Sequence, residues 1–580
     1  MESPLWNVKP FDRTHVPGGI RTPNLLIRSQ LLYPVELQTP LIFDFRFSIG
    51  KGKKTYPRKQ LELSKEICSK TRRKITRMNL STIGFRAAAA IAFLVSVSIA
   101  KAQRFPEAFG QRFQANQNAE RARGPRAGLD TLHRWNQIAI NASGLDHTPL
   151  APGETRIFGE QLGPARASRA MAIVHIAMFD AVNAIVGGYQ GYTNVTAKSG
   201  AASLDAAISQ AAHDALIALF PSQASTFDRF LSEDLARVAS KAQKGDGIDL
   251  GRRAAAAILA LRVGDGSEVA EPLLGIGAGF HETSNLAGHW RQDPISLIPL
   301  ALGAHWGQCK PFVLQTTNQF RTPPPPEMTS AEYATAFNEV KRVGGDGVVT
   351  PTQRTAEQTF IGTFWAYDGT PSLCAPPRLY NQIVVQIADQ TRLGTPELAR
   401  LFALVNVAMA DTAMAVWESK FYWDFWRPIT GIRESDPGTG PLGAGDGNSA
   451  TTGDPTFHPL GAPASNLVGP NFTPPFPAYP SGHAGIGGAI FETLRRFYGT
   501  DRIGFTFVSD EFNGVTKASD GNVRPYMARS FSTFSQAEEE NGQSRIYLGI
   551  HWAFDKTQGI AQGHRVADYI FDRTFLPVRH

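Results

Sequence analysis

Cysteine is scarce in this sequence, with three among 580 residues. Cys68 lies in an irregular N-terminal stretch, which leaves Cys309 and Cys374 in the remainder of the chain. In an oxidising compartment these two could form a disulfide. Two buried free thiols are the alternative, because the spacing does not decide between them. The remainder of the chain therefore holds at most one disulfide.

Long apolar runs are equally scarce. The run at 87–100 is 14 residues long, too short to span a bilayer comfortably. Basic residues precede it and the small-residue site Ala100-Lys101-Ala102 follows it, an order typical of a cleavable export signal. A buried core helix is the alternative, but it would rarely combine these flanks. We therefore predict a signal peptide at residues 78–102 and a soluble mature protein, secreted or periplasmic, without a membrane partner.

An excess of positive charge is missing from most of the chain. Residues 1–77 carry 16 Lys and Arg against 6 Asp and Glu, whereas the remainder carries 42 against 45. The net charge of +7 therefore belongs to the first 77 residues and indicates no nucleic-acid partner for the folded body. Because a signal peptide belongs at the start of a chain, we expect the true start at Met78 and interpret residues 1–77 as an upstream extension.

Alternating strand patterns are also scarce, whereas helical periodicity is common. Residues 166–186 are apolar on most faces, which predicts a buried helix. We expect an extended arm at 103–126, a turn at Gly245–Gly247 and further helices at 204–220, 226–243, 250–263, 331–343, 356–367, 377–389, 396–417, 482–498, 534–549 and 557–575. The sequence thus predicts an all-α fold of two packed bundles, an N-terminal one at 103–325 and a C-terminal one at 326–580.

Three segments of the second half concentrate groups that bind anions. Lys420 and Arg427 are seven residues apart, two helical turns, so both project from one face. Ser481-Gly482-His483 opens a helix, where backbone N–H groups favour an anion. Arg545 precedes His551 by six residues. Each segment alone has an ordinary explanation as a solvated helix face, a helix cap or a partly buried histidine.

Together and in this order, the three segments form the pattern KxxxxxxRP, PSGH and SRxxxGxHxxxD, the last letter being Asp555. This pattern resembles the signature of the superfamily shared by vanadium haloperoxidases and type 2 phosphatidic-acid phosphatases. Further similarity, strong from 363 to 572 and weaker from 166 to 312, is to the chloroperoxidase-like haloperoxidases. The resemblance implies two packed four-helix bundles.

The resemblance also implies a vanadate cofactor, with His551 as its metal ligand and His483 as the acid–base group. The other vanadate-binding residues would be Lys420, Arg427, Ser481, Gly482 and Arg545. Three cations around one oxyanion form a pre-organised electrostatic clamp, and guanidinium suits oxyanion geometry. Lys420 would also polarise bound peroxide.

Three more residues receive roles by the same resemblance. Asp368 would join His483 and Lys420 as a catalytic residue by holding Arg545 in place. The alternative is that Asp368 only ends a helix or forms a turn. Trp417 and Phe476 would line the halide pocket, and core packing is the alternative for Trp417. We expect these residues to form one site.

The expected function is oxidation of bromide, and more finely of chloride, by hydrogen peroxide to hypohalous acid, which reacts with a small organic acceptor. The alternative is an acid phosphatase, in which His551 attacks phosphorus and His483 protonates the leaving group. Trp417 and Phe476 weigh against it, because an apolar wall suits a poorly hydrated halide. A binding protein without catalysis is disfavoured because no clamp residue is missing.

Overall fold

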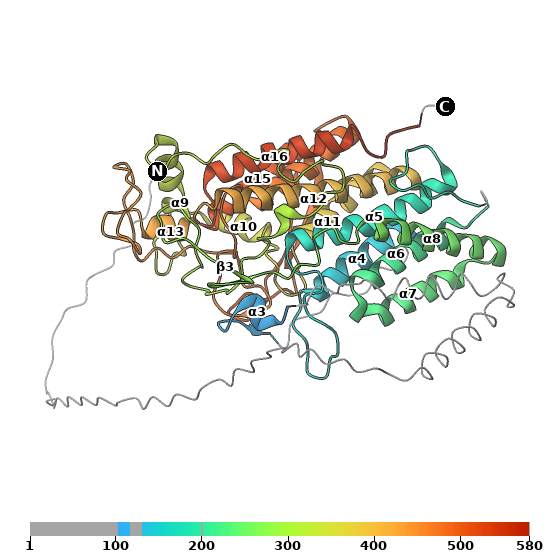
Figure 1. Cartoon of the computed structure of the whole chain (residues 1–580), viewed down its shortest axis with the longest axis horizontal. Helices are drawn as coiled ribbons and strands as arrows, with labels where there is room; N and C mark the ends of the chain where they lie inside the picture. The colour runs from blue at the N-terminus through green and yellow to red at the C-terminus, as the bar shows by residue number, and fades with distance from the viewer. Residues whose placement is uncertain (1–102, 117–129, 199–200, 579–580) are drawn as a thin grey trace, which may run out of the picture. The chain divides into compact units, whose positions relative to one another are not determined.

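The longest helix, α12 (Thr395–Trp423), lies among the other main helices in a computed structural model that describes residues 103–116, 130–198 and 201–578. Every residue from Leu398 to Trp417 is buried. Helices α5 (Pro164–Val186), α14 (Gly482–Tyr498) and α16 (Ala553–Phe571) pack against it (Figure 1). A helix covered on all sides is expected to be largely apolar, and the few buried polar residues of α12, such as Asn406 and Asp411, have hydrogen-bond partners.

Helices α14 and α16 approach each other closely because small residues separate them. A Cβ at Gly563 would lie 2.1 Å from the carbonyl oxygen of Gly485. A Cβ at Gly559 would lie 2.7 Å from the carbonyl oxygen of Ser481. Any larger side chain at these positions would separate the start of α14 from α16. The glycines therefore fix the distance between two of the predicted anion-binding segments.

The remaining helices are α3 (Phe105–Phe109), α4 (Thr131–Asp146), α6 (Leu204–Leu219), α7 (Ala224–Arg237), α8 (Lys241–Leu261), α9 (Ala331–Val343), α10 (Ala356–Phe364), α11 (Pro376–Thr391), α13 (Pro428–Arg433) and α15 (Phe534–Tyr547). Short 3-10 helices lie at Pro221–Gln223 and Trp306–Gln308. Strands β1 (Gln114–Ala115) and β4 (Leu467–Val468) pair antiparallel, β2 (Leu273–Leu274) and β3 (Phe280–His281) parallel, and β5 (Phe505–Asn513) and β6 (Tyr526–Phe531) antiparallel. The predicted helical class is confirmed.

The predicted turn at Gly245–Gly247 is wrong, because these residues lie inside α8. The Ser240 side chain caps that helix by accepting from the Gln243 N–H. A Cβ at Gly247 would lie 2.6 Å from the Ser203 oxygen, and one at Gly251 would lie 2.5 Å from the Ala207 oxygen. The glycines thus serve close packing of α8 on α6.

Two other local predictions need correction. The expected extended arm contains α3, whose Phe109 is buried, while residues 117–126 lie outside the described part. The hairpin of β5 and β6 was missed, although Phe505, Phe507, Ser509 and Glu511 alternate as buried residues along β5. A short amphipathic strand of this kind carries a weak signal beside long helices.

The two halves of the chain share one hydrophobic core, which includes Trp135 and Ile173 from the first half and Leu404 and Ile490 from the second. The boundary at 325/326 stays a prediction. The best apolar windows of α5 and α12 are long enough to cross a membrane, but 78% and 100% of them are buried inside the protein. Core packing accounts for their apolar character.

Cys309 and Cys374 are both buried free thiols, so the disulfide alternative is excluded in this structure. Burial raises the pKa of the Cys309 thiol to about 12, which keeps it protonated. Cys68, the predicted extension and the predicted signal peptide lie outside the described residues.

Candidate active site at an anion clamp

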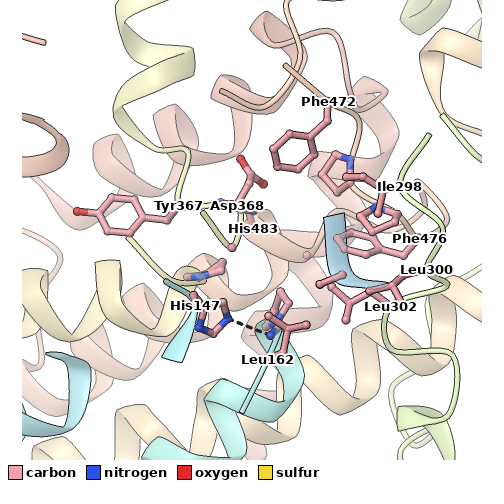
Figure 2. Close-up of a pocket in the computed structure, with 18 of the residues that line it drawn as sticks. His147, Leu162, Ile298, Leu300, Leu302, Tyr367, Asp368, Phe472, Phe476 and His483 are labelled. Atoms are coloured by element: carbon pink, nitrogen blue, oxygen red, sulfur yellow. Dashed lines mark hydrogen bonds between the residues drawn. The ribbon is translucent and has the colours of Figure 1, made fainter. Parts of the chain in front are cut away.

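The predicted site residues meet at a pocket of about 700 Å³. Its walls are mostly apolar and come from distant segments. His147 and Leu162 lie on one side, and Ile298, Leu300 and Phe476 line another (Figure 2). Seven of the predicted site residues line the pocket directly, namely Asp368, Trp417, Phe476, Gly482, His483, Arg545 and His551. A concave, apolar pocket with a few converging polar groups is typical of a small-molecule site.

Lys420 and Arg427 lie beneath this lining and are 0% and 1% exposed. Helix α12 carries Lys420 in its last turn and ends at Trp423, whereas Arg427 is extended and precedes α13. The prediction that both project from one helix face is therefore wrong, because Pro428 disfavours helical geometry at the residue before it. The Lys420 Nζ donates to the carbonyls of Pro477 and Ala478 at 2.8 and 2.9 Å. Burial and the neighbouring guanidinium of Arg427 hold the pKa of Lys420 well below its usual range. Segment 476–478 therefore positions Lys420 without neutralising it.

Arg427 is held by backbone carbonyls in the same manner. Its Nε donates to Phe476 O and its Nη1 to Ile550 O, each at 2.9 Å. Burial lowers the pKa of Arg427 to about 9. Its Nη2 is buried and has no hydrogen-bond partner within the described part of the chain.

Arg545, at the end of α15, has a carboxylate partner. Its Nη2 donates to Asp368 Oδ1 at 2.5 Å, and both side chains are buried. Burial raises the pKa of Asp368, while the adjacent guanidinium of Arg545 opposes this rise. The Nε and Nη1 of Arg545 have no partner among the described residues.

These contacts leave the cluster with excess positive charge. Three cations face two buried carboxyls, Asp368 and Asp555, and burial raises the pKa of Asp555 to about 7. Buried cations and unpaired buried donors are costly unless a counter-ion satisfies them. Three guanidinium nitrogens without a partner, Arg427 Nη2 and Arg545 Nε and Nη1, therefore fit an oxyanion, as the clamp prediction requires. Among the described residues no group of three His, Cys, Asp or Glu side chains could hold a bare metal cation.

His551 presents a lone pair to this clamp. Its Nδ1 contacts Asp555 Oδ2 at 2.7 Å, and its Nε2 lies 2.9 Å from Arg427 Nη1. A guanidinium only donates, so Nε2 accepts and the proton is on Nδ1. Burial and the three nearby cations hold the pKa of His551 well below its usual range. A neutral imidazole oriented by a carboxylate is the form that binds a metal.

Helix α14 directs its N-terminus at the same place. Ser481 is its N-cap, and the Ser481 Oγ accepts from the Ala484 N–H at 3.4 Å. Gly482, the first helical residue, lines the pocket, and the first N–H groups of a helix have no partner within the helix. The geometry suits an anion at Gly482.

His483 follows on α14 and lines the pocket. Its Nε2 donates to the carbonyl of Ala366, 2.5 Å away. Burial and the charge of Arg545 hold the pKa of His483 well below its usual range. This pKa describes the clamp without an anion, and a bound anion would raise it.

Trp417 and Phe476 form an apolar wall. Their ring centroids are 4.9 Å apart in an edge arrangement, and the Phe476 ring lies 5.1 Å from Lys420 Nζ and 4.9 Å from Arg427 Cζ. The Trp417 indole N–H donates to Leu302 O at 2.9 Å. All ten predicted side chains or N–H groups thus belong to one connected site.

The sequence did not indicate the opposite wall. His147, from the end of α4, uses both ring nitrogens: Nδ1 contacts Ser143 O at 2.8 Å and Nε2 accepts the Gly163 N–H at 3.0 Å (Figure 2). It therefore offers only ring carbon atoms to the pocket. No local motif marks a histidine of this kind. Asp555 was noted only as a letter of the motif, although its i,i+4 spacing from His551 was a usable signal.

Comparisons with known proteins agree with this geometry. Residues 400–579 match the family described as the VCPO second helical-bundle domain. Vanadium chloroperoxidase from Curvularia inaequalis is 35% identical over 333 residues, which are 48% of this chain and 52% of that protein. The chain thus spans about half the length of the curated relative that it matches.

Solved structures show the same fold. The crystal structure of a bacterial vanadium-dependent iodoperoxidase superposes with a TM-score of 0.59 at 22% identity, covering 77% of this chain and 97% of that one. A holo-type bacterial vanadium-dependent chloroperoxidase gives 0.52 at 17% identity, with 70% and 92% coverage. Every predicted site residue except Asp368 lies within residues 400–579. Residues 400–579 of this chain are therefore similar to the second helical-bundle domain of vanadium chloroperoxidase, and the chain has the fold of the bacterial vanadium haloperoxidases.

Proposed function

We propose that this protein is a vanadium-dependent haloperoxidase that oxidises halide with hydrogen peroxide to hypohalous acid. The observation that carries the proposal is the buried clamp of Lys420, Arg427 and Arg545 around the neutral His551. The clamp has excess positive charge and unsatisfied N–H donors, which an oxyanion with one open coordination position would satisfy. The relationship to vanadium chloroperoxidase identifies vanadate as that oxyanion.

The residues of the clamp would share the binding of vanadate. His551 Nε2 supplies the metal ligand, and Asp555 holds the ring in that tautomer. Arg427 and Arg545 donate to its oxygens through the N–H groups that are unsatisfied here, together with Ser481 Oγ and the Gly482 N–H. Bound vanadate supplies Lewis-acid activation of peroxide. Two of the three Lys420 N–H groups are used by carbonyls, so the third would donate to an oxygen of the bound group and polarise it.

His483 is the proposed acid–base residue. The Ala366 carbonyl accepts a hydrogen bond from the Nε2–H, so Nδ1 of the neutral ring carries the lone pair that can accept a proton. Burial and the charge of Arg545 lower the pKa of His483, which favours the neutral ring that can accept this proton. A group of this kind is suited to moving protons during turnover.

The wall of Trp417 and Phe476 is the proposed halide side. Both rings are buried, and a halide beside them would lose much of its hydration. Bromide is the expected substrate, with chloride as the finer proposal. Hypohalous acid would then react with a small organic acceptor.

The deciding experiment compares activity with and without added orthovanadate. Purified protein should halogenate a phenolic dye only when vanadate, bromide and peroxide are all present. A chain that instead hydrolyses p-nitrophenyl phosphate, and is inhibited by vanadate, would be a phosphatase using the same clamp. Arg545→Ala serves as the control that removes the clamp from either activity.

We further propose that residues 78–102 direct export of the enzyme to the periplasm or medium. The basic flank, the short apolar run and the Ala100-Lys101-Ala102 site support this proposal. N-terminal sequencing of protein from the native host should begin close to Gln103. A mature chain that retains residues 78–102 would contradict it.

A further inference from the structure

Glu271 is a buried carboxylate that lies outside the anion clamp. Its side chain is 3% exposed and has a basic partner, Arg166 of α5, with Nη2 3.3 Å from Oε1. The same Oε1 accepts the indole N–H of Trp306 at 3.0 Å. The other oxygen, Oε2, accepts the backbone N–H of Gly303 at 2.6 Å. Both carboxylate oxygens are thus committed to the segment 303–306.

The segment that Glu271 holds lies directly against Trp417. Gly303 has a φ of +92°, and a Cβ there would lie 2.0 Å from Trp417 Cδ1 and 2.1 Å from its Nε1. The preceding carbonyl, Leu302 O, accepts the indole N–H at 2.9 Å. The backbone of residues 302–303 therefore fixes the five-membered edge of the indole.

The opposite edge of the same indole lies against the start of α14. A Cβ at Gly482 would lie 3.1 Å from Trp417 Cη2 and 3.2 Å from Cζ3. The ring therefore fits between two glycines, one on the loop and one at the anion-binding helix start. Leu302 N also donates to Pro475 O at 3.0 Å, which ties the loop to the residue before Phe476. A shift of residues 302–303 would therefore displace both Trp417 and Phe476, the two rings of the apolar wall.

We propose that Glu271 is a positioning residue that sets the halide side of the pocket by holding Gly303, and through it Trp417, against Gly482. The inference rests on the proposed haloperoxidase function. Charge-assisted hydrogen bonds to a buried carboxylate are among the stronger ones in proteins, so the loop is held tightly. Arg166 forms an ion pair with the carboxylate on the side away from the Gly303 N–H, through Oε1. Glu271 itself does not line the pocket, so it acts only through the loop.

Glu271→Gln tests this role with little change in volume. An amide has one acceptor oxygen, so either the Gly303 or the Trp306 N–H would face an NH2 group. We expect the KM for bromide to rise about tenfold, the effect of losing one strong buried hydrogen bond. Because the clamp is untouched, kcat and the Kd for vanadate, measured by equilibrium dialysis, should change at most about threefold.

The environment of Trp417 can also be measured directly, in protein that is not catalysing the reaction. In protein labelled with 5-fluorotryptophan, the Trp417 resonance is assigned by Trp417→Phe, and it should shift or broaden in vanadate-free Glu271→Gln. Asp180→Asn is the matched control: Asp180 is also buried and accepts the Tyr192 and Thr193 N–H groups at 2.8 Å, yet does not line the pocket. The control should lose comparable stability while keeping the Trp417 resonance and the bromide KM.

If Glu271→Gln does not fold, the same measurements are made on Gly303→Ala. It leaves Glu271 intact but forces a methyl group into the indole, so it should give the same resonance shift and KM rise. An unchanged Trp417 resonance and an unchanged bromide KM in either folded variant would overturn the inference. Absence of halide oxidation in the wild type would instead refute the proposed function, and the resonance of the vanadate-free protein would still decide the role of Glu271.

Discussion

Nη1 of Arg427 lies 2.9 Å from Nε2 of His551, inside hydrogen-bonding distance of the atom that the family pattern makes the metal ligand. Because guanidinium is a permanent donor, this contact exists only while His551 is neutral. Asp555, on the other ring nitrogen, selects the tautomer. The carboxylate directs the lone pair to Nε2, and Arg427 Nη1 must release that lone pair when Nε2 binds a metal.

His551→Ala should abolish retention of vanadium, because only hydrogen bonds would then hold the anion. His483→Ala should retain vanadium and lose turnover by about 10²–10⁴-fold, since it removes proton transfer. Vanadium content after dialysis and steady-state bromide oxidation measure the two effects. His213→Ala, a buried histidine of α6 outside the pocket, is the control. Equal vanadium retention by both site variants would contradict this division of roles.

Asp368→Asn should weaken vanadate binding about 10- to 100-fold, because it removes the charge that orients Arg545. The geometry of the clamp then depends on backbone contacts alone. Equilibrium dialysis with vanadate measures the change. Asp265→Asn disrupts another buried Arg–Asp cluster, with Arg169 and Arg262, and should leave vanadate affinity unaltered. If the two variants bind vanadate equally well, Asp368 does not position Arg545.

Phe476→His should reduce chloride oxidation more than bromide oxidation. The apolar ring near Lys420 and Arg427 keeps the local dielectric low, which strengthens their pull on the reacting oxygen, and chloride is the harder halide to oxidise. Wild-type chloride oxidation should increase as the pH falls, because the lowered pKa of His483 requires acid for protonation. Phe476→Leu should preserve the chloride-to-bromide rate ratio. Equal losses for both halides in Phe476→His, or no chloride oxidation at any pH, would refute the assignment.

Glu511 should make folding stability depend on pH. Burial raises the pKa of Glu511 from 4.5 to about 7, although Arg524 opposes this rise. The folded state therefore binds more protons than the unfolded state between these values. The stabilisation is complete below pH 4.5 and is lost as the pH rises to about 7. Denaturant unfolding at pH 5 and pH 7 should show a loss of about 2 kcal/mol in the wild type relative to Glu511→Gln. Glu332→Gln, at an exposed position, should follow the wild type, and identical slopes for all three proteins would exclude Glu511 as the cause.

The sequence by itself determined the helical class and the identity of the clamp. The helical class is a local property, because periodicity marks α5, α9 and α14. The clamp was identified by the resemblance of its motifs to a family signature, whereas the single helix predicted to carry both Lys420 and Arg427 ends at Trp423. The three motif segments could be assigned to one site because together they resemble a known family signature, whereas each segment alone has an ordinary explanation. The sequence misplaced Gly245–Gly247, since a glycine that permits close packing looks the same as one that permits a turn.

Only the tertiary structure decided what surrounds the clamp. Asp368 accepts from Arg545, His147 accepts from the Gly163 N–H, and Glu271 accepts from the Gly303 N–H of the loop beside Trp417. The two residues in each of these contacts are 16 to 177 positions apart in the sequence. No periodicity or spacing encodes such contacts, because they arise when helices and irregular segments pack into one core. The free state of Cys309 and Cys374 was decided in the same way, by where folding places each thiol. The chemistry of the site is therefore visible in local sequence, whereas the shape and polarity of its pocket depend on long-range packing.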